Sequence, residues 1–535
     1  MGKFLKGAAI LSIAGILVKI MGAFFRIPLT NWVGADGLSY YSSAYMVYSV
    51  LLVISTAGIP IAVSRMVAER VALNDYYSAK RLFKVALIGL SLLGAISFVL
   101  MYFCSDFIAS VLVANPGASL SIKALAPAVL IVPIMSAFRG YFQGMQNMVP
   151  TAASQFFEQL GRVVVGLFLA HKFLSIDHMT VSAGATFGCS AGAIFGLITL
   201  IIIYFINSKA INNQIELNKD NSYYQPLKEL IKEMLVITIP ITIGSCIIPI
   251  ISASDSVIVM RRLQATGWSY EEAKLLWGRL GGYCDSIINL PSVLITGITA
   301  SVLPLIATSI RLKKLDEAKE NSESAIKLVM MISSPCAAGL FALSYPILKM
   351  LYPNPNIAQE VQDAIPTLRI LCFTVILGAL TSSLGAILQA IGKQTRNLIN
   401  MLVGYIFKIL CSIFLVGIAA ININGAPIGS IICELVIIIL DIGVLRDTLN
   451  FKLKWSSTII KPVISSLIMG ILAFLTYTLL FNITDSIIVS TLVSVIVGVI
   501  SYAILILLTK TINKKVLLAM PKGEKIVQKL DRFLE

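Results

Sequence analysis

One stretch of the chain decides its fold. From Ser486 to Thr509 the sequence reads SIIVSTLVSVIVGVISYAILILLT, without a charged side chain. In helical form, an apolar run of about 20 residues crosses the roughly 30 Å of hydrocarbon in a bilayer. Membrane barrel strands would instead alternate apolar and polar residues with period two, which this run does not do. The stretch therefore predicts a membrane-spanning α-helix.

Similar runs recur along the whole chain of 535 residues, which is 57% hydrophobic and only 13% charged, with a mean hydropathy of +0.88. Such a composition leaves too little polar surface to cover a water-soluble globule. We predict an all-α integral membrane protein of about fourteen transmembrane helices. The expected spans begin at Gly7, Tyr40, Leu82, Leu120, Thr151, Val181, Lys228, Asp285, Ser324, Ala364, Asn397, Pro427, Thr458 and Asp485.

The formal charge of +15 reflects a membrane orientation and not a nucleic-acid surface. About thirty of the 42 basic residues fall in alternate loops, and the opposite loops hold about seven, as the positive-inside rule requires for an even number of helices. Both termini are therefore expected in the cytoplasm. An exception is the segment 261–279, which is basic on the expected outer side and which we interpret as a short amphipathic helix.

Weak internal similarity suggests two related halves. Gly58-Ile59 recurs as Gly297-Ile298, and Leu73 recurs as Leu312 at the same separation along the chain. We predict an N-terminal lobe of six helices (1–210), a C-terminal lobe of six helices (211–450), two extra helices (451–510) and a basic cytoplasmic tail (511–535). Repeated halves of transporters enclose a site at the membrane centre and expose it alternately to each side.

Cations within the first helix are the leading site candidates. Lys19 and Arg26 share one helical face with Gly15 and Gly22. Two cations beside an aqueous cavity suit a phosphate or pyrophosphate, because charges inside the bilayer are costly unless they serve a pathway. The alternative is that both side chains extend to opposite membrane interfaces.

Two further polar faces could contribute to a substrate site. In the fifth expected helix, Glu158 and Arg162 have the i,i+4 spacing of an ion pair, which would either contact substrate or hold the helix to its neighbours. The eighth expected helix carries a polar stripe that could line a transport path. Its residues are Asp285, Asn289, Ser292, Thr296 and Thr299.

Three acids in expected spans are candidates for ion coupling, namely Asp255, Glu434 and Asp441. Each would either bind a proton or sodium ion or neutralise a basic residue on a neighbouring helix. No phosphate-binding GxxxxGK[ST] motif is present, and the two histidines fall on an expected external loop. We therefore expect no bound cofactor, metal or catalytic residue, and transport driven by Na⁺, H⁺ or the membrane potential.

A family resemblance rests on two motifs. Arg139-Gly-Tyr-Phe-Gln-Gly, followed by the segment from Asn147 to Arg162, resembles the sporulation stage V protein B branch of the polysaccharide flippases. The opening Lys19-Ile-Met-Gly, with Arg26 and Val33-Gly-Ala, is similar to the same branch and to the related MurJ branch. The resemblance covers nearly the whole chain. It implies the multidrug/oligosaccharidyl-lipid/polysaccharide (MOP) exporter superfamily, in which two six-helix lobes form a cavity and first-helix arginines face it.

The resemblance further implies a flippase of the bacterial plasma membrane that moves a polyprenyl-pyrophosphate-linked sugar by alternating access. In the MurJ branch, the two additional helices line a groove for the polyprenyl tail. The expected partners are this substrate, the bilayer and other cell-wall synthesis proteins, with a monomeric chain. Two departures affect the expected substrate: Tyr283-Cys-Asp-Ser replaces the Tyr-Ala-Asp-Arg of MurJ-like chains, and the second helix lacks a cavity arginine. A drug or cation exporter and a membrane glycosyltransferase are the alternative functions.

Overall fold

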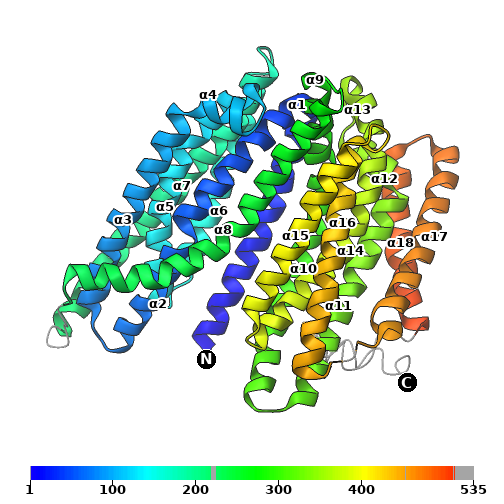
Figure 1. The fold of residues 1–535 in the computed structure, drawn as a ribbon. Coiled ribbons are helices and arrows are strands. Elements are labelled where there is room, and N and C mark those ends of the chain that lie inside the picture. The colour runs from blue at the N-terminus through cyan, green and yellow to red at the C-terminus, as the bar shows by residue number, and fades with distance from the viewer. Residues whose placement is uncertain (1, 219–224, 452, 510, 512–535) are drawn as a thin grey trace. The chain divides into compact units, whose positions relative to one another are not determined.

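The computed structural model describes residues 2–218, 225–451, 453–509 and 511, apart from some side chains of α1 (Gly2–Thr56) and α10 (Asp285–Arg311). This part of the chain is helical, without a strand, and confirms the all-α membrane fold (Figure 1). Its other helices are α2 (Gly58–Ala72), α3 (Tyr76–Phe103), α4 (Ser105–Phe107), α5 (Ser119–Gly144), α6 (Val149–Lys172), α7 (His178–Leu217), α8 (Leu227–Ala265), α9 (Tyr270–Arg279), α11 (Leu315–Ala342), α12 (Ser344–Leu351), α13 (Ala358–Asp363), α14 (Ile365–Ala390), α15 (Gln394–Val416), α16 (Gly425–Leu449), α17 (Lys461–Thr484) and α18 (Ile487–Leu508).

Eleven helical segments in the described ranges are long and apolar enough to cross a membrane. The first, Ala14–Ala72, joins α1 and α2 and overlaps both of the spans that were expected to begin at Gly7 and Tyr40. The helices α6 and α10 are not among the eleven; both carry the polar faces noted in the sequence. The expected number of fourteen spans therefore stays a prediction, and residues 512–535 of the expected basic tail lie outside the described residues.

Helix α1 bends at a single glycine. Gly34 has φ 59° and ψ −163°, a conformation outside the helical region that side chains with a Cβ rarely adopt. The two expected spans that begin at Gly7 and Tyr40 therefore form one kinked helix without an intervening loop. The kink separates Arg26 from Tyr41, two residues whose side chains meet again at the site described below.

The chain forms two compact units, and the first consists of residues 1–264 and 268–282. Its core lies where α3 and α5 pack, around Leu82, Leu90, Leu125 and Tyr141. Lipid tails are as apolar as these side chains, so close packing, more than escape from water, must hold such helices together. The unit includes α8 and α9, which follow the expected lobe boundary at residue 210; the predicted boundaries stay a prediction.

Small residues bring α6 close to α7 within this unit. A Cβ added at Gly188 would lie 2.6 Å from the Arg162 carbonyl oxygen, and one added at Gly192 would overlap the carbonyl of Glu158. Glycines one turn apart thus let the two backbones touch, as small-residue stripes do in membrane helices. The contact fixes the rotation of α6 and turns its polar side chains toward α1 and α5.

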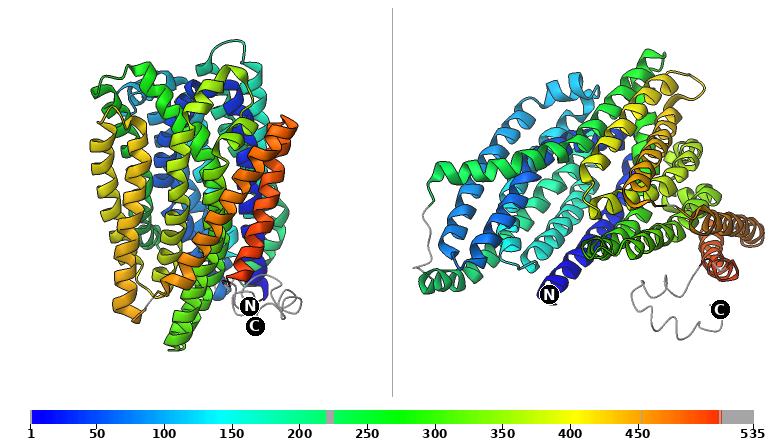
Figure 2. Two further views of the ribbon diagram at one scale, coloured as in Figure 1. Left: turned by 90° about the vertical axis from the view of Figure 1, so that its right-hand side faces the viewer. Right: turned by 60° about the horizontal axis from the view of Figure 1, so that its bottom comes forward.

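The second unit consists of residues 265–267 and 283–535. Ile326 and Met330 of α11 pack against Leu384 and Leu388 of α14, and Leu445 of α16 completes this core. The last two helices, α17 and α18, run side by side (Figures 1 and 2). Helix α17 also packs on α11, which attaches the pair to the rest of the unit.

Candidate functional site

Two arginines of the first unit meet at one tyrosine. The Arg162 Nη2 atom on α6 donates a hydrogen bond of 2.6 Å to the Tyr41 hydroxyl on α1. The Arg26 guanidinium lies 5.9 Å from the centroid of the same ring. Tyr41 is almost fully buried, with 3% of its surface exposed. We call Arg26, Tyr41, Tyr45 and Arg162 the arginine–tyrosine cluster.

Aromatic faces hold Arg162 in place. Its guanidinium lies 5.5 Å from the ring centroid of Phe25 and 5.1 Å from that of Tyr45. The ring quadrupoles attract the cation and compensate part of the cost of removing it from water. An arginine held in this way keeps its charge while most of its hydrogen-bond donors remain available for an anion.

Arg26 is held by the backbone. Its Nη2 atom donates a hydrogen bond to the Gly281 carbonyl, just beyond α9. The Nε atoms of Arg26 and Arg162 are both buried and lack a hydrogen-bond acceptor in the described part of the chain. Neither arginine forms an ion pair with a described carboxylate. Among the described residues these two cations thus have no acidic partner, an arrangement suited to binding an anion.

The structure corrects the expected partner of Glu158. Its carboxylate is bound by Arg139 of α5, through Nη2 at 2.7 Å, and not by Arg162. Arg139 Nε also donates to Ser154 Oγ at 2.9 Å, so the guanidinium spans two residues of α6. The i,i+4 spacing allowed a pair with Arg162, but the tyrosine of α1 competes for that cation. Glu158 therefore joins α6 to α5.

Lys19 lies two turns before Arg26 on α1, and its side chain is exposed. Gly22, between them, faces Gln159 of α6, whose Nε2 atom would lie 3.7 Å from an added Cβ. The face of α1 that the sequence singled out is therefore the one that approaches the polar face of α6. The role of Lys19 and Arg26 as an anion site stays a prediction.

A second polar cluster in the first unit joins α9 to α1. The Lys274 side chain is 5% exposed, and its ammonium forms ion pairs with Asp36, at 2.6 Å, and with Glu271. It also donates to the Tyr40 hydroxyl at 2.9 Å. Burial disfavours the charged ammonium, but the hydrogen bonds to Asp36, Glu271 and Tyr40 outweigh it and raise the pKa of Lys274 above its ordinary value. The segment expected as one amphipathic helix, 261–279, is divided: residues 261–265 end α8, and 270–279 form α9, which buries a charged residue against α1.

His178, interpreted as an external loop residue, begins α7 and contacts the same cluster. Its Nδ1 atom lies 3.0 Å from the Asp36 Oδ2 atom. The N-cap of this helix is Asp177, whose pKa is lowered because its carboxylate accepts hydrogen bonds from Thr180. No group of three or more His, Cys, Asp or Glu side chains that could hold a metal occurs in the described ranges.

The expected polar stripe of the second unit lies on α10. Asn289 and Ser292 are exposed, and Asp285 is half-buried. The Asn289 amide donates to the Asp285 carbonyl at 2.7 Å, and the buried Thr299 hydroxyl bonds to the Ile295 carbonyl. The side chain of Thr296 lies outside the described residues. The stripe is present on the helix, and its contact with substrate stays a prediction.

The three expected coupling acids lie in different surroundings. Asp255 is buried on α8 of the first unit, at 7% exposure. In the second unit, Asp441 of α16 is fully buried and accepts a hydrogen bond of 2.7 Å from the Asn400 amide of α15. Glu434 lies two turns earlier on α16, and its Oε1 atom would lie 3.7 Å from a Cβ added at Gly378 of α14. Asp441 is thus bound by an amide, and the coupling role of all three acids stays a prediction.

Comparison with known proteins decides the family. The sequence profile described as "Polysaccharide biosynthesis protein" matches residues 4–310, more than half of the chain. The chain belongs to the polysaccharide biosynthesis protein family. A second profile, MatE, matches residues 281–414 of this family member.

Two relatives from Bacillus subtilis narrow its place in the family. Stage V sporulation protein B is 24% identical over 84% of this chain and 85% of that protein, and lipid II flippase MurJ is 26% identical over 77% of each. A solved structure of lipid II flippase MurJ, in an inward closed conformation, superposes with a TM-score of 0.64 at 16% identity, covering 92% of this chain and 97% of that one. This family member is therefore a multi-pass membrane transporter of the MurJ- and SpoVB-like kind in the MOP superfamily.

Proposed function

We propose that this transporter is a flippase for a polyprenyl-pyrophosphate-linked sugar, such as lipid II or a related cell-wall precursor. It would move the charged head from the inner to the outer leaflet by alternating access. One observation carries the proposal: Arg26 and Arg162 converge on Tyr41 within the membrane unit, and neither has a described carboxylate partner. Retaining two such cations is costly unless an anion compensates them.

The chemistry of the two arginines fits a pyrophosphate. Each guanidinium presents a planar set of donors that matches phosphate oxygens, and both are already oriented by an aromatic ring or a backbone carbonyl. Lys19, exposed on the same face of α1, would add a mobile charge. Asp285, Asn289, Ser292 and Thr296 would meet the sugar or its peptide, and Asp255, Glu434 and Asp441 would couple the cycle to a cation gradient.

Reconstitution tests the proposal. The full chain is placed in liposomes with fluorescent lipid II, and transfer between leaflets is followed by accessibility to an external reagent. Arg26→Ala and Arg162→Ala should each lower the rate by about tenfold or more, because each removes charge-assisted hydrogen bonds. Arg65→Ala is the control, since Arg65 is exposed on α2 and pairs with Glu69. Wild-type rates in both test variants, at equal protein levels, would refute the anion site.

The MatE match to residues 281–414 favours a second candidate, an exporter of drugs or organic cations. A cation substrate should be bound by acids, and it would be repelled by Arg26 and Arg162. Cells that express the chain should therefore fail to expel a cationic dye if the flippase proposal is right. Dye export that survives Arg26→Ala would favour the exporter, and a new covalent product from lipid II would favour a glycosyltransferase.

A further inference from the structure

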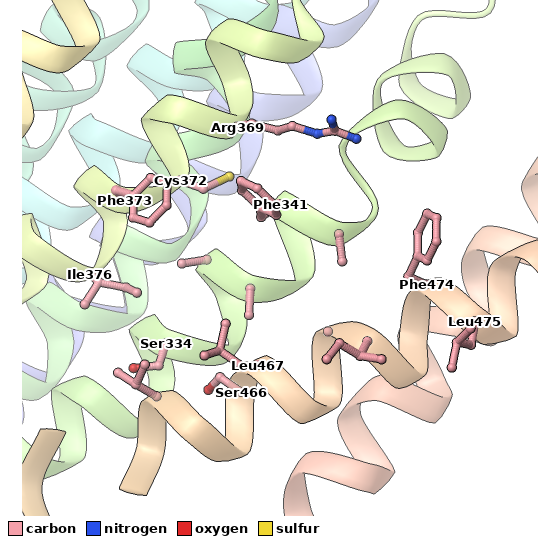
Figure 3. A pocket seen from close by; sticks show the side chains of 16 residues that line it. Ser334, Phe341, Arg369, Cys372, Phe373, Ile376, Ser466, Leu467, Phe474 and Leu475 are labelled. Atoms are coloured by element: carbon pink, nitrogen blue, oxygen red, sulfur yellow. The ribbon is translucent and has the colours of Figure 1, made fainter. Parts of the chain in front are cut away.

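A long apolar groove runs along the second unit between α11, α14 and α17 (Figure 3). Its volume is about 510 Å³. Small residues such as Ala337, Ala338 and Gly470 form part of its wall, and Phe341, Phe373 and Phe474 contribute aromatic rings. Small side chains leave a channel between helices, and the aromatic rings can flank an alkyl chain. The groove thus has the form expected for a lipid chain.

Its length matches one membrane leaflet. The groove contacts α17 from Val463 to Leu475, which corresponds to about 18 Å at 1.5 Å per residue. One leaflet is about half of the roughly 30 Å hydrocarbon core. Leu467 and Ile471 of this helix are largely exposed, at 57% and 61%, so the groove flanks a surface that itself faces the bilayer. A single acyl chain would therefore fit along it.

One cation lies at the end of the groove. The Arg369 guanidinium is at the opposite end from Ser334 and Ser466 (Figure 3). Its Nε atom donates to Ser344 Oγ at 3.1 Å, and its charge lies 5.7 Å from the Phe341 ring centroid. No described carboxylate pairs with it. The guanidinium is thus oriented through Nε, and its two Nη groups remain available for an anion.

We propose that this groove binds one membrane phospholipid, with its phosphodiester at Arg369 and one acyl chain along α17. The charges decide between lipid classes. A phosphodiester carries one negative charge and matches the single cation that lines the groove, whereas a pyrophosphate would call for the paired cations found in the first unit. No residue of α18 lines this groove, so it is distinct from a groove between the last two helices, and the site is independent of the proposed flippase activity. It would keep a lipid bound between α17 and the remainder of the unit.

A photoreactive phospholipid tests the site. Phosphatidylglycerol with a diazirine in its acyl chain is irradiated with the full-length protein in nanodiscs, and labelled peptides are mapped by mass spectrometry. Labels should fall on the groove segments 337–342 and 463–475. Arg369→Gln should reduce this labelling about tenfold through loss of charge-assisted hydrogen bonds. Ala342→Phe should also reduce it, by filling the groove near Arg369.

Lys349→Gln is the matched control. Lys349 is an exposed cation on the neighbouring α12 that contacts Tyr345 and does not line the groove. Its loss should leave the labelling unchanged. Equal labelling of wild type and Arg369→Gln, or labelling that polyprenyl pyrophosphate displaces and excess phosphatidylglycerol does not, would overturn the proposal. A diacylglycerol probe, which lacks the phosphate, should label wild type no better than it labels Arg369→Gln.

Discussion

The Arg162 guanidinium and the Tyr41 hydroxyl are joined by a hydrogen bond of 2.6 Å between α6 and α1. The bond links the polar face of α6 to the part of α1 that follows the Gly34 kink. Because Arg26 contacts the same ring from before the kink, Tyr41 fixes the positions of both cations at once. A binding group that is held before the ligand arrives loses less entropy on binding.

Tyr41→Phe should lower lipid II transfer about tenfold, equivalent to about 1.4 kcal/mol, because it removes the hydroxyl that orients a charged donor. The ring remains, so packing and protein level should be unchanged. Tyr45→Phe is the control: the Tyr45 ring lies 5.1 Å from Arg162, and its hydroxyl makes no described hydrogen bond to that cation. The liposome assay measures both variants, and equal rates would show that orientation by Tyr41 is unimportant.

Gly192→Ala should destabilise the protein by about 1–3 kcal/mol, because its methyl group would overlap the Glu158 carbonyl and push α6 away from α7. The shift would also displace Arg162, one turn along α6, so transfer of lipid II should fall together with the melting temperature. Thermal unfolding in detergent measures the loss.

A matched glycine provides the comparison for that substitution. A Cβ at Gly89 of α3 would meet nothing within 4 Å, so Gly89→Ala should leave stability unchanged or raise it slightly. If the two alanine variants unfold at the same temperature, the close approach of α6 and α7 does not limit stability.

Lys274→Met should lower the free energy of unfolding by about 3 kcal/mol. This is the low end of the range for removing one partner of a buried ion pair, because Asp36 is partly exposed. The pKa of Lys274 is raised in the folded state, so its stabilising charge is fully present below the ordinary lysine pKa. That contribution is lost only as pH rises through the folded value. The stability difference should therefore be constant from about pH 6 to 9.

His178 must be replaced before this pH dependence is measured. His178 shares Asp36 with Lys274, and histidine titrates within the same pH range. The measurement is therefore made in a His178→Gln background, by thermal unfolding with and without Lys274→Met. A difference that shrinks steadily between the two pH values would contradict the assignment of the charge to Lys274.

The sequence predicted which face of a helix is polar more reliably than which residues of neighbouring helices the polar side chains contact. Lys19, Arg26, Glu158 and Arg162 are visible because charges are rare in apolar runs. Tyr41 was missed, since a tyrosine in an apolar helix resembles an ordinary core residue. The partner of Glu158 was wrong because spacing along one helix cannot show that Arg139 of α5 lies closer.

Pairs that are distant along the chain were also beyond sequence reasoning. Asp36 and Lys274 meet only because Gly278 lets α9 approach the backbone at Ala35. Periodicity shows which face of a helix is polar, but the choice of neighbour depends on packing between helices. The buried position of Lys274 could have been suspected from Gly278, Gly281 and Gly282, since glycines mark close approach.

Asp441→Asn should abolish the response of transport to an ion gradient while leaving the fold intact. Asp441 is fully buried, and only one of its carboxylate oxygens, Oδ1, accepts a hydrogen bond from Asn400. The other oxygen, Oδ2, has no described donor, so within the described chain no cation neutralises this acid. A proton or Na⁺ would therefore be favoured at this carboxylate, whereas an amide of the same shape cannot take up the proton and has no negative charge to neutralise Na⁺. Asp447→Asn, at the exposed end of the same helix, is the control. In liposomes with an imposed Na⁺ or pH gradient, wild type and Asp447→Asn should be stimulated and Asp441→Asn should not; stimulation of all three would remove Asp441 from the coupling pathway.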